Sequence, residues 1–337
     1  MTNETKNWHI VAVRRLSDAQ LTALSEVAEV SYFQDLNSSN RAEFLTALSQ
    51  AHGLIGGKLE LSEAELAEAP ALQVVSTISV GYDHLPLEAL NRRGILLCNT
   101  PDVLTDTTAD TAFALIMATQ RRLVELANLV RNGDWRAHIG TEHFGVDVHS
   151  KTLGIVGAGR IGAAIARRGA LGFDMPIRYT ASSSKPALEH SLGAQRRDLA
   201  ELLAEADIVC ISVPYSDDTH HLIDANALAQ MKPTASLINI ARGNVVDELA
   251  LIEALRSGRL RAAGLDVFAV EPLPADSPLT TMDNVVTTPH IGSATHETRE
   301  LMAQLAVENL LGALTGSGPY NAVNEDVWRR AADAKEE

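Results

Sequence analysis

The stretch from Lys151 to Gly162, KTLGIVGAGRIG, decides the fold of this chain. It begins with an apolar run typical of a buried strand and continues directly into a turn with the spacing GxGxxG. The residues after the turn, RIGAAIARRGALGF, have the periodicity of an amphipathic helix. A strand, a glycine-rich turn and a helix in this order predict a Rossmann-type dinucleotide-binding unit.

Each glycine of the turn has a mechanical reason. Gly157 allows the tight turn, Gly159 lets the backbone approach a pyrophosphate, and Gly162 allows the helix to pack closely on the strand. Arg160 and Ile161 complete the predicted binding loop at the N-terminus of the helix, where free N–H groups attract phosphate. The alternative is a glycine turn without a ligand, but the strand and helix around it favour the binding loop.

Short apolar runs alternate with helical stretches on both sides of this turn, as parallel sheets covered by helices require. The predicted strands of the first hundred residues are HIVAV, GLIGG, LQVVSTIS and ILLCNT. After the turn they are IRYTA, DIVCISVP, SLINIA and AAGLDVF, and one last helix is predicted over Thr295–Leu314. We predict two doubly wound parallel-sheet α/β domains: a Rossmann dinucleotide-binding domain, residues 107–294, inserted into a flavodoxin-like substrate-binding domain of residues 1–106 and 295–330.

Composition limits the partners of the chain. The 337 residues carry a formal net charge of −15 without a cluster of Lys and Arg, which argues against a nucleic acid or a membrane surface as partner. Cys98 and Cys210 lie in apolar stretches and are interpreted as small core residues, not as a disulfide or metal site. The start of the chain does not resemble a signal peptide, so a cytoplasmic location is predicted.

The segment 108–150 is predicted to form a subunit interface. A single helix over Thr108–Val130 shows a broad apolar stripe, and an extended arm follows it up to Ser150. Because twofold dimers are the commonest oligomers, a homodimer is expected.

The tip of the second strand after the glycine turn predicts the cofactor. An Asp or Glu is expected there to bind the ribose hydroxyls of NAD, but the chain has Ala181 followed by Ser182, Ser183 and, two residues on, Lys185. Hydroxyls and a lysine can bind a 2′-phosphate, so NADP(H) is predicted to be preferred, with NAD(H) possible. The alternative is a serine-rich turn that binds nothing.

Three downstream segments supply a cation, a carboxylate and an imidazole: Arg242 in NIARGNVVDE, Glu271 in GLDVFAVEPLP and His290 in TTPHIGSATHETR. A guanidinium matches a carboxylate ligand in shape and charge, and an imidazole beside a carboxylate can hold a proton for transfer. The remaining histidines show no metal-ligand spacing, so no metal is predicted.

These segments, with STISVGYDHLPLEAL and CNTPDVLTDTTAD, resemble the D-isomer-specific 2-hydroxyacid dehydrogenase family, and most closely its glyoxylate/hydroxypyruvate reductase branch, which includes 2-ketogluconate reductases. The resemblance implies that Arg242 binds the substrate carboxylate, that His290 is the acid–base group paired with Glu271, and that Val80 and Gly81 hold the same carboxylate. In that branch an Arg commonly follows the second strand, where this chain has Ser182. The further predicted cofactor-binding residues, of which Asp266 resembles the group that bonds the nicotinamide amide, are Pro214, Thr219, Ala241, Asp266 and Gly292.

The resemblance implies NAD(P)H-dependent reduction of a small 2-keto acid to the D-2-hydroxy acid. Glyoxylate, hydroxypyruvate and 2-keto-D-gluconate stay open as substrates. A different class of function, a cofactor-sensing binding protein similar to transcriptional co-repressors of the same fold, is the alternative, and turnover of a keto acid separates the two.

Overall fold

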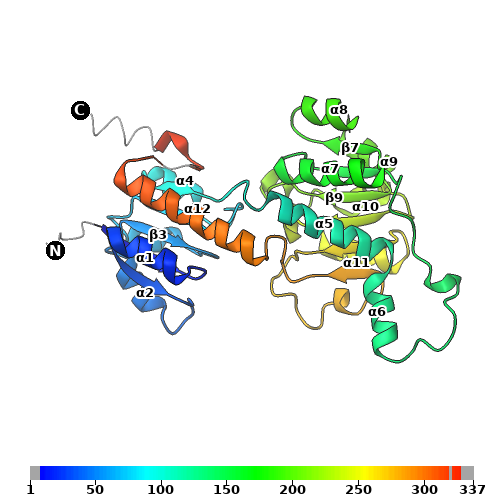
Figure 1. Cartoon of the computed structure of the whole chain (residues 1–337), viewed down its shortest axis with the longest axis horizontal. Coiled ribbons are helices and arrows are strands. Elements are labelled where there is room, and N and C mark those ends of the chain that lie inside the picture. Colours follow the sequence, from blue (N-terminus) through cyan, green and yellow to red (C-terminus); the bar gives the residue numbers. More distant parts are fainter. Residues whose placement is uncertain (1–7, 319–320, 328–337) are drawn as a thin grey trace. The chain divides into compact units, whose positions relative to one another are not determined.

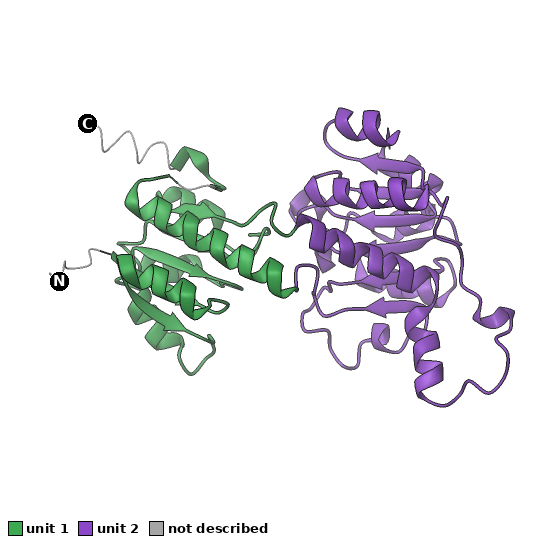
Figure 2. Cartoon of the chain, viewed as in Figure 1, with its two compact units in different colours: residues 1–104, 295–337 green, residues 105–294 purple. Residues whose placement is uncertain are grey.

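The structure, a computed structural model, describes residues 8–318 and 321–327. Residues 1–7, which bear on the signal-peptide prediction, and 328–330 of the predicted substrate-binding domain lie outside the described residues. The chain divides into two compact units (Figure 2). Unit 1 consists of Met1–Leu104 and Thr295–Glu337, and unit 2 of Thr105–Ala294. The chain therefore enters and leaves unit 2 once.

Unit 1 contains a five-stranded sheet, all parallel, in the order β2-β1-β3-β4-β5 (Figure 1). This order is that of flavodoxin-like folds and confirms the predicted class. The strands are β1 (Trp8–Val13), β2 (Ala28–Phe33), β3 (Gly53–Gly56), β4 (Val74–Thr77) and β5 (Leu96–Cys98). The helices are α1 (Asp18–Val27), α2 (Arg41–Leu48), α3 (Glu63–Ala67), α4 (Leu87–Arg92) and α12 (His296–Thr315).

Strand β2 was not among the predicted strands, because its sequence AEVSYF lacks the apolar run of the others. Only its two ends, Ala28 and Phe33, are buried. The strand lies at the edge of the sheet and pairs with β1 alone, so its middle needs few apolar side chains.

Unit 2 contains a seven-stranded parallel sheet in the order β12-β11-β10-β9-β6-β7-β8. The chain runs outward from β6 to β8, then crosses to β9 on the other side of β6 and continues to β12, which is the Rossmann order with one added edge strand. The strands are β6 (Leu153–Val156), β7 (Ile177–Thr180), β8 (Gln195–Arg196), β9 (Ile208–Ile211), β10 (Ser236–Asn239), β11 (Ala262–Leu265) and β12 (Val285–Thr287). The α-helices are α5 (Thr105–Gln120), α6 (Leu123–Arg131), α7 (Arg160–Phe173), α8 (Pro186–Leu192), α9 (Leu199–Glu205), α10 (Ala225–Gln230) and α11 (Glu248–Arg256). The 3₁₀ turns are η1 (Thr141–His143), η2 (Asp217–Thr219), η3 (Gly243–Val245) and η4 (Pro278–Thr280).

The core of unit 2 has one layer on each face of its sheet. Alternate residues of β9 belong to opposite layers: Val209 to the layer that includes residues of α11, and Cys210 to the layer that includes residues of α5. Burial on both faces explains why the strands read as continuous apolar runs. Both cysteines are buried, as predicted for small core residues, and burial raises the pKa of the Cys98 and Cys210 thiols to about 12.

The prediction of one helix over Thr108–Val130 was wrong, since the structure has two helices with a break at Arg121 and Arg122. Arg122 is left-handed, with φ +53°, and its guanidinium forms an ion pair with Glu125. The carbonyl of Gln120, the last residue of α5, accepts a hydrogen bond at 2.9 Å from Val146 in the arm. The returning arm therefore donates a hydrogen bond to a carbonyl at the end of α5, where the helix breaks. Of the helices in the described part of the chain, none is long and apolar enough to span a membrane.

Candidate active site

The three predicted catalytic residues follow three neighbouring strands. Arg242 comes after β10, Glu271 after β11 and His290 after β12, and these strands are adjacent in the sheet of unit 2. Because the carboxyl ends of parallel strands share one edge, the fold gathers the three residues at the edge that carries the glycine turn after β6.

Glu271 and His290 form the central pair of the site. Glu271 Oε2 lies 2.8 Å from His290 Nδ1, and Glu271 Oε1 accepts a hydrogen bond of 3.1 Å from the backbone N–H of Phe268. Because an ionised carboxylate only accepts hydrogen bonds, the proton between the two groups belongs on Nδ1, which leaves Nε2 for a substrate. The His290 side chain is 44% exposed, so a small molecule can reach it.

Asp266 holds the loop that carries His290. Its Oδ1 accepts from the Thr288 hydroxyl at 2.7 Å and from Ile291 N–H at 2.8 Å, and its Oδ2 accepts from Gly292 N–H at 2.8 Å. The N–H of His290 itself donates to the carbonyl of Asp266 at 2.9 Å. Asp266 is only 1% exposed. A buried carboxylate with three donors is fixed in place, so the described contacts make Asp266 a positioning residue for His290.

Arg242 is positioned by the end of β10. The buried Asn239 side chain donates to the carbonyl of Arg242 at 3.0 Å and accepts from the N–H of Ala241 at 3.1 Å, which fixes the turn. A Cβ on Gly243 would lie 1.9 Å from the carbonyl carbon of Phe268, so only glycine allows this close approach. The turn with Arg242 therefore contacts the backbone segment that bonds Glu271. Asn239 was missed, although an Asn ending the apolar run SLIN is a visible signal.

The glycine turn fits a dinucleotide. Gly157 has φ +98°, and a Cβ there would lie 2.7 Å from Val213. A Cβ on Gly162 would lie 2.1 Å from the carbonyl oxygen of Gly157, so helix α7 packs directly on the turn. By contrast, a Cβ on Gly159 would meet nothing within 4 Å. The open space at Gly159, directly before the first turn of α7, is where a pyrophosphate would bind to free N–H groups.

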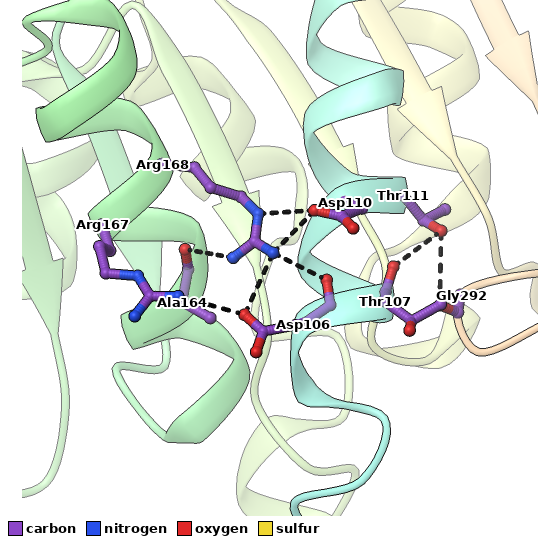
Figure 3. Close-up of polar contacts among 8 residues, drawn as sticks. All are labelled: Asp106, Thr107, Asp110, Thr111, Ala164, Arg167, Arg168 and Gly292. Carbon is purple, nitrogen blue, oxygen red and sulfur yellow. Dashed lines mark hydrogen bonds and ion pairs between the residues drawn. The ribbon is translucent and has the colours of Figure 1, made fainter. Parts of the chain in front are cut away.

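Helix α5 contacts both α7, which begins at the glycine turn, and the loop after His290 (Figure 3). Arg168 on α7 donates from Nε to Asp110 at 2.8 Å and from Nη2 to the Asp106 carboxylate at 3.1 Å, both on α5. On another side of α5, the Thr111 hydroxyl lies 3.4 Å from the carbonyl oxygen of Gly292. The helix that begins at the glycine turn and the loop after His290 are thus attached to one common element.

The turn after β7 contains the residues predicted to select the cofactor. Ser182 and Ser183 are exposed, and Lys185 Nζ lies 3.4 Å from Ser183 Oγ. Arg196, from the short edge strand β8, donates from Nη2 to the carbonyl oxygens of Ala181 and Ser182 at 2.9 and 3.3 Å. Arg196 was not predicted, because β8 has only two residues and no apolar pattern.

The other predicted cofactor residues also follow strands of unit 2. Thr219 donates from its hydroxyl to the carbonyl of Pro214 at 2.8 Å and so closes the loop after β9. Ser212 in the same loop donates to the carbonyl of Gly157 at 2.7 Å. Ala241, 8% exposed, directly precedes Arg242. The structure therefore brings these residues to the same sheet edge as the glycine turn.

Val80 and Gly81 belong to unit 1, in the loop after β4. Their carbonyl oxygens accept from the side chains of Asn99 at 2.8 Å and Ser79 at 2.7 Å, respectively. Their N–H groups donate to no residue in the described ranges. Two adjacent backbone N–H groups that donate to no other residue can bind an anion.

Comparison with known proteins identifies the family. The sequence model of the D-isomer specific 2-hydroxyacid dehydrogenase NAD-binding domain matches residues 113–292. The glyoxylate/hydroxypyruvate reductase B of Yersinia enterocolitica is 53% identical over 302 residues, which cover 90% of this chain and 93% of the relative. The Yersinia pestis protein of the same name is also 53% identical, over 304 residues, with the same shares covered.

Solved structures agree with this result. A Thermus thermophilus protein has a TM-score of 0.86 and 44% identity, covering 94% of this chain and 99% of that chain. The NADPH-dependent glyoxylate/hydroxypyruvate reductase of Sinorhizobium meliloti, in complex with NADP and malonate, has a TM-score of 0.82 and 30% identity, covering 94% and 97%. The chain therefore belongs to the D-isomer-specific 2-hydroxyacid dehydrogenase family, in its glyoxylate/hydroxypyruvate reductase branch, and is an NAD(P)-dependent dehydrogenase that reduces a small 2-keto acid.

Proposed function

We propose that the enzyme reduces glyoxylate, hydroxypyruvate or 2-keto-D-gluconate to the 2-hydroxy acid, in the D configuration for the two products that are chiral at C2, with His290 as the acid–base group. The observation that carries this proposal is the contact of 2.8 Å between Glu271 Oε2 and His290 Nδ1, which leaves Nε2 free to reach a substrate oxygen. The relatives named glyoxylate/hydroxypyruvate reductase support the choice of small substrates.

Each catalytic residue has one task in this proposal. The Arg242 guanidinium binds the substrate carboxylate, and its positive charge stabilises the developing alkoxide. His290 donates a proton from Nε2 to that oxygen, while Glu271 stabilises the imidazolium that precedes transfer. The N–H groups of Val80 and Gly81 bind a carboxylate oxygen. A bound reduced nicotinamide supplies the hydride that the keto carbon receives.

The cofactor residues are proposed on the same basis. The glycine turn at Gly157, Gly159 and Gly162, with Arg160 and Ile161, holds the pyrophosphate. The residues proposed to line the rest of the dinucleotide site, with Asp266 at the nicotinamide amide, are Pro214, Thr219, Ala241, Asp266 and Gly292.

A panel of 2-keto acids assayed with NADPH and NADH tests the proposed activity. We expect the highest kcat/KM among glyoxylate, hydroxypyruvate and 2-keto-D-gluconate. Pyruvate, which lacks the hydroxyl groups of the last two, and 2-ketoisocaproate, which has a branched apolar chain, serve as comparisons. Turnover of none of the three substrates would instead favour a cofactor-sensing binding protein.

We further propose that NADPH is preferred to NADH. Ala181 stands where a ribose-binding carboxylate is expected, and Ser182, Ser183 and Lys185 can donate hydrogen bonds to a 2′-phosphate. The Sinorhizobium meliloti relative, described as NADPH-dependent, supports this preference.

Ala181→Asp is expected to reverse that preference. One or two charge-assisted hydrogen bonds give NADPH an advantage on the order of 10- to 10⁴-fold in kcat/KM, and the new carboxylate would repel the phosphate and bind the ribose hydroxyls instead. The measurement is kcat/KM for both cofactors. Ala187→Asp, on the exposed first turn of α8, is the matched control and should keep the wild-type ratio. An unchanged ratio in Ala181→Asp would contradict the proposal.

We also propose a homodimer formed through α6 and the arm. No residue of α6 is buried, and the exposed large apolar side chains of this segment are Leu123, Val124, Val130, Trp135, Ile139, Phe144 and Val146. So many apolar side chains along one segment exceed what an isolated surface ordinarily exposes.

Sedimentation at micromolar concentration should therefore show a dimer. Phe144→Asp, which places a charge on a side chain that is 60% exposed, should shift the equilibrium toward monomer by at least about tenfold in Kd. Leu249→Asp, on α11 and 80% exposed, is the control and should leave the dimer intact. A wild-type protein that sediments as a stable monomer would rule out the interface.

For the cellular location we propose the cytoplasm. The two free and buried cysteines, Cys98 and Cys210, suit a reducing compartment.

A further inference from the structure

The short edge strand β8 carries Arg196, an arginine that has no role in the proposed function. Its Nη2 bonds two carbonyl oxygens, those of Ala181 and Ser182, in the turn where the 2′-phosphate is expected. This contact places a guanidinium directly beside the ribose end of the dinucleotide site. A pocket at this point is lined by Thr180, Ala181, Arg196, Arg197, Asp198, Leu199 and Glu201.

The neighbouring Arg197 uses its guanidinium for hydrogen bonds within the protein. Arg197 bonds Glu205 from Nε at 2.8 Å, the Gln195 side chain from Nη2 at 2.6 Å and the carbonyl of Arg196 from Nη1 at 3.0 Å. Glu205 also pairs with Arg178, and these two arginines hold the pKa of its carboxyl below the usual range. The guanidinium of Arg197 is therefore held by hydrogen bonds within the fold.

Arg196, by contrast, bonds only neutral carbonyls among the described residues, and only through Nη2. The nearby carboxylates have other partners. Glu189 accepts from the hydroxyls of Tyr179 and Ser184, and these bonds lower the pKa of its carboxyl; the charge of Arg196 adds to this effect without a hydrogen bond between the two side chains. Asp198 and Glu201 form the capping box of α9. The guanidinium of Arg196 thus keeps its charge and its Nε and Nη1 donors for a ligand.

We infer that Arg196 is the cation that binds the 2′-phosphate of NADP(H), in place of an arginine directly after β7. The inference rests on the proposed preference for NADPH. A guanidinium anchored by Nη2 to the turn presents its remaining donors at a fixed place, which suits a phosphate oxygen. Lys185, whose Nζ lies 3.4 Å from Ser183 Oγ, and the serine hydroxyls would add bonds from the other side of the turn.

The test is equilibrium binding measured by isothermal titration calorimetry with NADPH, NADH, 2′,5′-ADP and 5′-ADP. Arg196→Gln should raise the Kd of NADPH and of 2′,5′-ADP by about 10- to 100-fold, the loss expected for one charge-assisted hydrogen bond, and leave the Kd of NADH and 5′-ADP unchanged. Arg196→Lys should give an intermediate Kd for NADPH. Arg197→Gln is the matched control, because Nε, Nη1 and Nη2 of Arg197 all bond groups of the protein, and it should not separate the two cofactors.

The outcomes distinguish this inference from the proposed preference. If wild type binds NADPH more tightly and Arg196→Gln keeps that ratio, Arg196 is not the phosphate ligand, although the preference stands. If Arg196→Gln weakens the binding of NADH and NADPH equally, Arg196 only holds the turn. If Arg197→Gln raises the Kd of NADPH as much as Arg196→Gln does, the effect is one of general electrostatics. Either result overturns the inference. If wild type binds NADH as tightly as NADPH, both the preference and the role of Arg196 are refuted.

Discussion

His290→Ala is expected to lower kcat for keto-acid reduction by about 10²–10⁴-fold, the usual contribution of a general acid–base group. The Kd of NADPH should stay at its wild-type value, because the turn that fits the pyrophosphate follows β6 and not β12. Single-turnover kinetics together with cofactor titration measure the two quantities separately.

The reverse reaction gives a second test of the same residue. His290 donates a proton to the keto oxygen in reduction and accepts one from the hydroxyl group in oxidation, so His290→Ala should lose rate in both directions. His296→Ala, an exposed histidine six positions further on, is the control and should retain wild-type rates. A His290→Ala enzyme with near wild-type kcat would refute the assignment.

Arg242→Ala is expected to lower kcat/KM by about 10²–10⁴-fold, the loss of two charge-assisted hydrogen bonds between a guanidinium and a carboxylate. Arg242→Lys should recover only part of this loss, because an ammonium keeps the charge but not the planar fork. The KM for the keto acid should rise in both variants, and the Kd of NADPH should not change. Steady-state kinetics at varied keto acid measure the effect.

The control for Arg242 is Arg256→Ala at the exposed end of α11, which removes the same charge from unit 2. It should leave kcat/KM unchanged. If Arg242→Ala raised the KM of NADPH and not that of the keto acid, the role assigned to Arg242 would be wrong.

Much of the site could be predicted from the sequence because its parts are local. The glycine turn, the apolar strand before it and the helix after it lie within one short stretch. The dinucleotide-binding loop can therefore be predicted without knowledge of tertiary contacts. Arg242, Glu271 and His290 each follow an apolar strand, and in a parallel sheet strand ends share an edge. The pairing of Glu271 with His290 was implied by the family resemblance, and the structure adds its geometry.

What could not be predicted depends on contacts between distant segments. The break between α5 and α6 lies where Gln120 accepts a hydrogen bond from Val146, with no Gly or Pro at the break to mark it. Strand β2 has no apolar run because it lies at the edge of its sheet. Arg196 meets the turn after β7 only because β8 pairs with β7. In each case the structure of the segment depends on the distant segment that it contacts, and its own sequence does not show this contact.

The backbone at His290 shows how folding and catalysis compete at one position. This residue is left-handed, with φ +53°, a conformation that costs a residue with a Cβ roughly 1–2 kcal/mol and glycine almost nothing. A histidine is therefore a poor choice for this turn by the criterion of stability, and it is held there by the bonds of its neighbours to Asp266. Engineering of this enzyme for heat resistance alone would favour glycine at position 290. The selected proteins would be more stable but would lack the acid–base group.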